Sequence, residues 1–316
     1  MLRLIFKRLA QMVLIMAVVS LVLFAIFDSD KFKKQIAVAE LGGFAVSALS
    51  DQDYQNWLAS KGLDVPFYER YVKWVGGVFQ GDLGTSFEKN IEVSTLVGER
   101  LVKTGILAFW VFALMIPIAL TLGVLAGMKE GSGQDRVITF ISVFTTSIPE
   151  LATAIFLMVI FALTLGWFPP TSSMGQGWEY ERLVLPVLTL VLYDFGYVAR
   201  MTRASMAEVM TSQYIRTAVL KGVPKRDVII KHALRNALIA PFTVIVLQLN
   251  WLLSGVVVVE VVYQYNGFGR MLLEAALFGD VYVIQAGALA AVFIAVLSQI
   301  ISDVGYTFLN PRIRFS

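Results

Sequence analysis

Six long apolar stretches constrain this chain more than any other feature of its sequence. They occupy residues 9–27, 104–127, 137–165, 183–199, 237–259 and 281–301. About 20 apolar residues cross the hydrocarbon as a helix, and a backbone without water must satisfy its own hydrogen bonds there. The sequence therefore predicts an all-α integral membrane protein with six transmembrane helices. Prolines at 117, 149 and 241 predict bends in the second, third and fifth helices.

The composition agrees with a membrane protein and excludes several kinds of site. Of the 316 residues, 57% are hydrophobic and 16% are charged, and the net charge is only +3. The basic residues lie on particular loops rather than along one face that could follow a phosphate backbone, so we expect no nucleic-acid partner. The chain has no cysteine and a single histidine, His232, which excludes disulfides, thiolate sites and any multi-histidine metal site.

The first apolar stretch, 9–27, follows basic residues in the way that a signal peptide does. However, its apolar part is longer than that of a signal peptide, and Asp28, Ser29 and Asp30 offer no small-residue cleavage site. We therefore expect a retained first helix that acts as its own insertion signal.

The distribution of basic residues predicts the orientation. Short cytoplasmic loops carry an excess of Lys and Arg. Such residues gather at the N-terminus, after the second helix, between the fourth and fifth helices and in the C-terminal tail. Both termini are therefore predicted to be cytoplasmic, with a long external loop after the first helix. We divide the chain into an N-terminal part, 1–103, and a core, 104–316.

The external loop is rich in aromatic residues. Tyr68, Tyr71 and Trp74 lie at helical spacing, which predicts a short amphipathic helix at the outer membrane surface.

The predicted cytoplasmic segment between the fourth and fifth helices has a helix–turn–helix pattern. Residues 204–218 are predicted to be helical, Gly222 ends that helix, and Pro224 precedes a second helix that begins near Arg226. A short helix of this kind can enter a groove on a soluble partner and transmit its movement to the adjoining membrane helices.

A spaced motif runs through this segment. It comprises Arg216-Thr217-Ala218, then Gly222, and then His232-Ala233-Leu234. The motif resembles the Glu-Ala-Ala motif of ABC importer permeases, although Arg216 stands where glutamate is typical. Further matches resemble the dipeptide, oligopeptide and nickel branch of that family, among them Gly81-Asp82-Leu83-Gly84 with Ser86, and Asn266-Gly267-Phe268-Gly269.

The resemblance implies a coupling helix that docks on an ATPase. Its residues would be Arg216, Thr217, Ala218, Lys221, Gly222, Val223 and Pro224. The implied partners are a second homologous permease, one or two ABC ATPase subunits, an extracytoplasmic substrate-binding protein and membrane lipid. The implied location is the inner membrane of a bacterial or archaeal cell.

The resemblance also indicates the cargo and the source of energy. The implied cargo is a di- or oligopeptide; oligosaccharides, opines and nickel chelates remain alternatives. The sequence has no Gly-x-x-x-x-Gly-Lys-Ser/Thr loop, so we expect ATP and Mg²⁺ on the partner ATPase, and neither a cofactor nor a catalytic residue in this chain.

Polar residues within the predicted helices are candidates for a translocation path. They are Asp194, Gln248, Asn250, Trp251 and Ser254. An ionisable residue in a membrane helix is costly, so Asp194 either attracts a cationic group of the cargo, pairs with a basic residue of the partner permease, or makes a hydrogen bond between helices that stabilises their packing. Glu150, directly after Pro149, is expected to cap backbone groups at that bend.

Two other classes of protein fit the sequence less well. An intramembrane protease would need a serine and a histidine, or paired metal ligands, within the helices, whereas His232 lies in the predicted cytoplasmic segment. A secondary transporter driven by an ion gradient would favour inverted repeats and more acidic residues inside the membrane.

Overall fold

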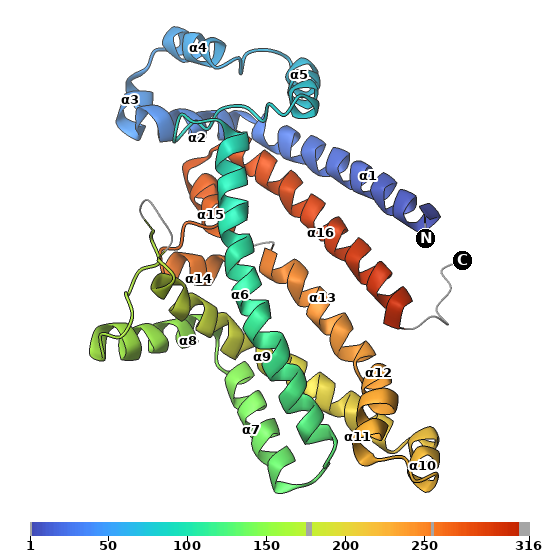
Figure 1. Ribbon diagram of the computed structural model, residues 1–316. Helices are drawn as coiled ribbons and strands as arrows, with labels where there is room; N and C mark the ends of the chain where they lie inside the picture. Colours follow the sequence, from blue (N-terminus) through green and yellow to red (C-terminus); the bar gives the residue numbers. More distant parts are fainter. Residues whose placement is uncertain (1, 175–178, 254–255, 310–316) are drawn as a thin grey trace. The chain divides into compact units, whose positions relative to one another are not determined.

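The computed structural model describes residues 2–174, 179–253 and 256–309, and these residues form helices joined by turns and loops (Figure 1). No β-strand occurs in these ranges beyond an isolated bridge between Thr85 and Glu92. The chain forms two compact units. The N-terminal unit comprises Leu2–Thr104 with Gly267–Val296, and the core unit comprises Gly105–Asn266 with the last part of α16, from Leu297.

The predicted external loop is mostly helical. The N-terminal unit begins with α1 (Leu2–Phe27), α2 (Asp30–Leu41), α3 (Gly43–Ala48), α4 (Asp51–Ser60) and α5 (Phe67–Phe79). The α5 helix confirms the predicted amphipathic helix. It buries Trp74 against Phe24 of α1, with the ring centroids 5.6 Å apart, while Val72 stays exposed on its other face.

The remainder of the N-terminal unit packs on its own hydrophobic core. That core contains Val93, Leu96 and Val97 of α6 (Val93–Gly127), residues of α15 (Phe268–Phe278), and Val283 and Ala286 of α16 (Val281–Leu309). The Phe268 N–H, at the start of α15, donates to the Thr104 hydroxyl at 2.8 Å, which satisfies one of the free N–H groups of the helix start.

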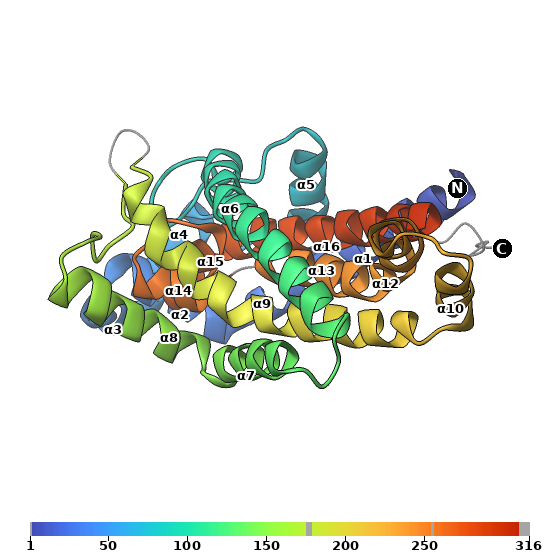
Figure 2. The same ribbon diagram turned by 60° about the horizontal axis from the view of Figure 1, so that its bottom comes forward.

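The core unit is arranged around α9 (Glu181–Met210). In Figure 2, α9 runs beside α7 (Gly133–Ser147) and α8 (Glu150–Leu157), and it also contacts α13 (Ile239–Leu253). In its most apolar window, 67% of residues are buried, compared with 11% in α1. The α9 helix is therefore enclosed by protein, whereas α1 presents most of its side chains outward, as a helix in lipid does.

Glycines allow the closest approaches to α9. A Cβ atom on Gly127 of α6 would lie 2.5 Å from the Arg203 carbonyl oxygen, and one on Gly196 would lie 2.3 Å from the Ser142 carbonyl oxygen. Such distances are too short for any side chain. Small residues at these positions let the backbones of α6, α9 and α7 pack directly, as is common between membrane helices.

Among the described residues, four helices are long and apolar enough to cross a membrane, and two bent pairs bring the number to as many as six. The first pair corrects the prediction of one bent helix over 137–165. There, α7 and α8 with η1 (Met158–Thr164) meet at 97°. Proline disfavours a helical conformation in the residue before it, and accordingly both Ile148 and Pro149 are extended. The segment is broken there, which is a larger change than the predicted bend.

The predicted fifth helix, 237–259, is also divided. The chain runs through α12 (Leu234–Ala237), bends by 48° into α13, and resumes after Val256 as α14 (Val257–Val262). The bend lies just before Pro241. Pro241 itself lies in the first turn of α13, where proline is tolerated. By contrast, α6 continues as a single helix through Pro117.

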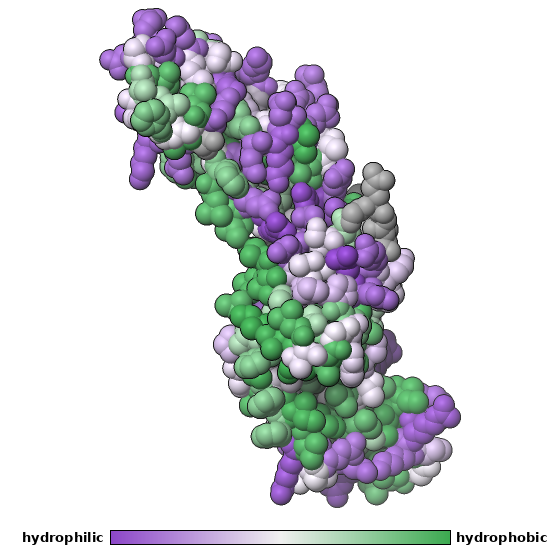
Figure 3. All heavy atoms as spheres, turned by 90° about the vertical axis from the view of Figure 1, so that its left-hand side faces the viewer, coloured by the Kyte–Doolittle hydropathy of each residue, from purple (hydrophilic) through white to green (hydrophobic). Residues whose placement is uncertain are grey.

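Large apolar side chains are exposed along the helices. Figure 3 looks onto the side on which α8 lies, where hydrophobic residues cover much of the surface. On α7 and α8, the side chains of Phe140, Phe144 and Phe156 are 69%, 58% and 62% exposed. Apolar surface of this extent needs lipid or another protein to cover it.

Candidate coupling segment and translocation path

The predicted coupling residues form a helix and a tight turn. The α10 helix spans Gln213–Leu220, and Gly222 follows it with a φ of +74°, a left-handed conformation that favours glycine. The N–H groups of Gly222 and Val223 donate to the carbonyls of Val219 and Ala218 at 3.0 and 3.2 Å, which closes the helix end. Pro224 then leads into α11 (Lys225–Asp227), η2 (Val228–Ala233) and α12.

The boundary before α10 differs from the prediction of one helix over 204–218. The α9 helix ends at Met210, and Ser212 adopts an extended backbone conformation. Serine is favoured at the residue before a helix because its hydroxyl oxygen can accept from a free N–H group of the first turn, but Ser212 does not make this bond. Here its hydroxyl donates to the Val209 carbonyl at 2.6 Å. The break lets α10 change direction relative to α9.

One face of α10 anchors the segment to the rest of the core unit. Ile215 and Ala218 are buried and pack in one cluster with Met206 of α9 and with Val228 and Ala233 of η2. At the edge of this cluster, the Asn236 amide donates to the Tyr214 hydroxyl at 2.9 Å. A displacement of α10 would therefore be transmitted to the end of α9 and to α12, which leads into α13.

The opposite face of α10 is exposed, and it is both apolar and basic. Val219 and Leu220 are 58% and 79% exposed. Exposed basic residues lie around them, namely Arg216, Lys221, Lys225 and Arg226. An exposed apolar tip with cations beside it is suited to a groove that has an apolar floor and acidic edges.

An ion pair stabilises the end of α9 that leads to α10. The Arg203 guanidinium donates two hydrogen bonds to the Asp135 carboxylate, at 2.9 and 2.8 Å, across 68 positions of sequence. The Asp135 side chain is only 4% exposed, and it also accepts from the Gly131 N–H at 2.9 Å. A bidentate ion pair of this kind fixes the relative orientation of its two side chains, so it holds the first turn of α7 against α9.

Asp194, the acidic candidate for the path, lies on the buried face of α9. It is 3% exposed, and one of its oxygens accepts a hydrogen bond from the Gln248 amide of α13 at 3.2 Å. Its other oxygen, Oδ2, has no hydrogen-bond partner among the described residues, and neither does Oε1 of Gln248. The structure thus brings two of the predicted residues together and leaves two buried acceptors without a donor.

Two further path candidates, Asn250 and Trp251, lie on α13 with Gln248. Trp251 stacks on Tyr193 with the ring centroids 5.9 Å apart, and Asn250 is half-buried on the same helix as Gln248. Ser254 lies outside the described residues. The expected capping by Glu150 is not seen for its Oε1 atom, which is buried without a hydrogen-bond partner in the described part of the chain.

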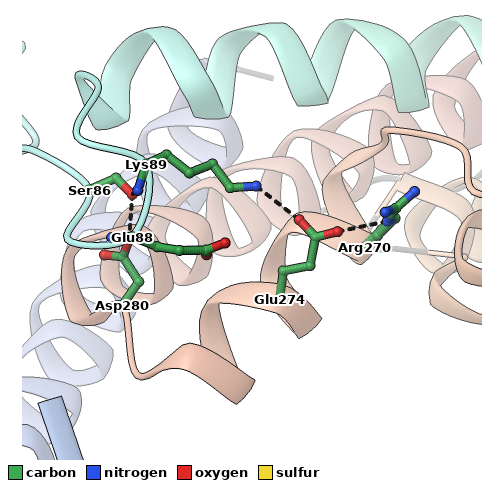
Figure 4. A network of polar contacts seen from close by, with 6 residues as sticks. All are labelled: Ser86, Glu88, Lys89, Arg270, Glu274 and Asp280. Carbon is green, nitrogen blue, oxygen red and sulfur yellow. Dashed lines mark hydrogen bonds and ion pairs between the residues drawn. The ribbon is translucent and has the colours of Figure 1, made fainter. Parts of the chain in front are cut away.

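A polar network in the N-terminal unit was not predicted (Figure 4). Asp280, 1% exposed and just before α16, accepts from the Ser86 hydroxyl and from the Glu88 N–H. Nearby, Glu274 of α15 accepts from Lys89 at 3.0 Å and from Arg270 at 2.7 Å. The network ties the 86–89 segment to α15 and α16. Arg270 and Glu274 have the i,i+4 spacing of a helix pair. Hydropathy and periodicity contain no signal for the other contacts, because Ser86, Glu88 and Lys89 lie 194, 192 and 185 positions from their partners.

Electrostatics within this network favour an ionised Glu274. Burial alone would raise the pKa of Glu274, but the hydrogen bonds and positive charges of Lys89 and Arg270 hold it below its ordinary value. The pKa of Glu88 is raised, chiefly by burial; the charge of Lys89 opposes this, and the carboxylates of Glu274 and Asp280 add to it. Within the described ranges, no three His, Cys, Asp or Glu side chains gather in an arrangement that could hold a metal ion.

Comparisons with known proteins give consistent matches. Residues 119–315 match the family described as "Binding-protein-dependent transport system inner membrane component". A putative peptide transport system permease protein of Brucella abortus is 35% identical over 317 residues, 99% of this chain and 99% of its own. The oligopeptide transport system permease protein AppB of Bacillus subtilis is 33% identical over 84% of this chain and 87% of its own.

Two further matches extend this comparison. The glutathione transport system permease protein GsiC of Shigella flexneri is 34% identical over 80% of this chain and 82% of its own. Among solved structures, a chain of the MetNI methionine ABC transporter in an inward-facing conformation matches with a TM-score of 0.51 and 19% identity, over 68% of this chain and 94% of that one. This last match shows a likeness of fold.

Proposed function

The chain belongs to the family of binding-protein-dependent transport system inner membrane components and is a permease subunit of an ABC importer, and on this premise we propose that it imports peptides. Relatives named for peptide, oligopeptide and glutathione transport support a peptide cargo. In this proposal a binding protein delivers the peptide, and this chain with a second homologous permease encloses the path.

The exposed face of α10 supports a docking site for the partner ATPase. Val219 and Leu220 are exposed beside four basic residues, on a helix whose other face is buried in the core unit. We propose that this face docks on the partner ATPase, where ATP and Mg²⁺ bind. Movement of the ATPase would then displace α10, and the cluster around Met206 would transmit that movement to α9 and α12. ATP hydrolysis would belong to the partner, and this chain would contribute no catalytic group.

The proposed orientation places α10 in the cytoplasm, together with both termini. It rests on the basic residues that gather around α10 and at the N-terminus. The long segment between α1 and α6 would then face the binding protein. The location is the inner membrane of a bacterial or archaeal cell.

Reconstitution tests this function directly. The complete importer is placed in proteoliposomes with a radiolabelled dipeptide and its binding protein outside, and with or without ATP inside. Uptake should require ATP and the ATPase subunits, and it should persist when ionophores remove all ion gradients. Uptake that proceeds without ATPase, or that stops when gradients collapse, would refute the proposal in favour of a secondary transporter.

The path residues are proposed to act within this cycle. Asp194, Gln248, Asn250 and Trp251 lie on two neighbouring helices of the core unit. Three acceptor oxygens among them have no hydrogen-bond partner among the described residues, namely Oδ2 of Asp194, Oε1 of Gln248 and Oδ1 of Asn250. We propose that, during transport, a hydrogen-bond donor of the cargo or of the second permease donates to these acceptor oxygens.

A further inference from the structure

Arg100, on α6, is a half-buried arginine without a partner. The Nε atom of its side chain is enclosed by protein, whereas its two terminal nitrogens are not, and no hydrogen bond or ion pair of this side chain occurs among the described residues. The other half-buried arginines whose side chains the structure describes all donate hydrogen bonds, namely Arg8, Arg70, Arg182, Arg200, Arg203 and Arg270. Arg100 therefore keeps donors that a bound group can reach.

The helix around Arg100 supplies no acid for it. On a helix, a side chain meets those three and four positions away. These positions hold Leu96, Val97, Lys103 and Thr104. Glu99 is adjacent in sequence, but it is exposed, and consecutive residues of a helix do not face each other. Lys103, by contrast, adds a second positive charge one turn further along.

The buried face of α6 carries Arg100. Val93 and Val97, about two turns and one turn before it, and Thr104, one turn after it, are all at most 5% exposed. Thr104 is in contact with the start of α15, because its hydroxyl accepts from the Phe268 N–H. Arg100 thus lies on the side of α6 that faces protein, which is an unusual place for a charge without a counter-charge.

Further along the same face, α6 packs on the helices of the proposed path. Leu107, two turns after Arg100, is buried in one hydrophobic cluster with Val191 of α9 and Leu252 of α13. Arg100 itself lies four residues before the apolar stretch 104–127, on the external side in the proposed orientation. A cation at the edge of the hydrocarbon is partly dehydrated, so an anion gains more by pairing with it than it would in water.

A peptide carries the group that such a cation binds best. It ends in a carboxylate, and a guanidinium donates to a carboxylate through charge-assisted hydrogen bonds, often two in parallel. The opposite end of a peptide is an ammonium group, for which α9 and α13 offer acceptor oxygens without donors. The chain therefore offers unpaired groups of both kinds that a peptide with free ends requires.

We propose that Arg100 is a specificity-determining residue, which binds the C-terminal carboxylate of a peptide before the peptide enters the path. This inference rests on the proposed function. It adds that the cargo is a peptide with a free carboxylate, and that a peptide whose C-terminus is blocked gains nothing from Arg100.

Uptake of a dipeptide and of its C-terminal amide tests this role. The complete importer in proteoliposomes receives radiolabelled alanyl-phenylalanine or its amide, each at a concentration that saturates the binding protein, and uptake without ATP is subtracted. Arg100→Gln should lower uptake of the free dipeptide about tenfold or more, because hydrogen bonds between two charged groups are lost, and should change uptake of the amide less than about twofold. Arg136→Gln, at an exposed position on α7, is the matched control and should leave both unchanged.

A cysteine at this position separates charge from packing. The chain has no cysteine of its own, so the purified Arg100→Cys chain is labelled at one position before the other subunits are added. A methanethiosulfonate reagent that attaches an ethylammonium group should restore uptake of the free dipeptide several-fold. Reagents that attach an uncharged propyl group or an ethylsulfonate group should restore none. This series decides the question if Arg100→Gln unfolds in a thermal melt.

Three outcomes would overturn the proposal. The first is full uptake of the free dipeptide by folded Arg100→Gln. The second is an equal fall for the dipeptide and its amide, or equal rescue by the ammonium and propyl groups, either of which would indicate a structural role. The third is loss of the second permease from the purified Arg100→Gln complex, which would make a carboxylate of that subunit the partner. An unchanged importer without any ATP-dependent peptide uptake would instead refute the proposed function, before any variant is compared.

Discussion

Truncation of Leu220 gives a sharp test of coupling, because its side chain is 79% exposed at the tip of α10. A side chain so exposed makes few contacts within the chain, so Leu220→Ala should change the free energy of unfolding by less than about 0.5 kcal/mol. If the ATPase buries this tip, the lost apolar groups should cost roughly 2 kcal/mol of docking free energy, which is about a 30-fold weaker affinity.

The assay titrates the ATPase subunits against the permease pair in nanodiscs, and ATP-driven uptake is measured with the same proteins in proteoliposomes. Leu277→Ala is the matched control, because Leu277 is 70% exposed at the end of α15, outside the proposed coupling segment. Ile215→Ala is the opposite case. Truncation of this buried side chain should lower the free energy of unfolding by about 2–4 kcal/mol. Wild-type ATPase affinity for a folded Leu220→Ala chain would refute docking through this tip.

Three further predictions concern other positions. Asp194→Asn keeps a hydrogen-bonding group beside Gln248 but removes the ability to ionise, so uptake of lysine-containing peptides should fall several-fold more than uptake of neutral ones; an equal fall would indicate a packing role. Arg203→Met leaves buried Asp135 without its partner and should destabilise the chain by about 2–4 kcal/mol, part of which Asp135→Asn should restore in a double mutant, as measured by thermal unfolding. The pKa of Glu274 is lowered in the folded state, so its network should stabilise the fold above the unfolded-state pKa and lose this contribution as the pH falls through the folded-state value, below about 4.5; hydrogen exchange of α15 at pH 3 and pH 7 checks this, and unchanged protection would contradict it.

Local patterns allowed several elements to be predicted from residues close together in sequence. The spacing of Tyr68, Tyr71 and Trp74 predicted α5, and the structure confirms it. Gly222 was expected to end a helix, and it does so with a positive φ. These features depend on side-chain periodicity and on backbone sterics, which act over a few residues.

The breaks and the contacts between helices were not predictable in the same way. Proline at 149 predicted a bend, but the 97° angle also depends on the extended backbone of Ile148 and on how α7 and α8 pack on α9. The bond from Ser86 to Asp280 joins residues 194 positions apart. No periodic pattern specifies which of many polar side chains will meet across such a distance.

The sequence by itself determined that this chain forms apolar helices with a basic, glycine-interrupted segment, because hydropathy and turn chemistry are properties of neighbouring residues. Only the tertiary structure decided that Asp194 meets Gln248, that Arg203 meets Asp135 and that Ser86 meets Asp280. Those arrangements depend on which helix faces pack together. The packing depends on all the contacts of the unit together, including the close approach of helix backbones at Gly127 and Gly196.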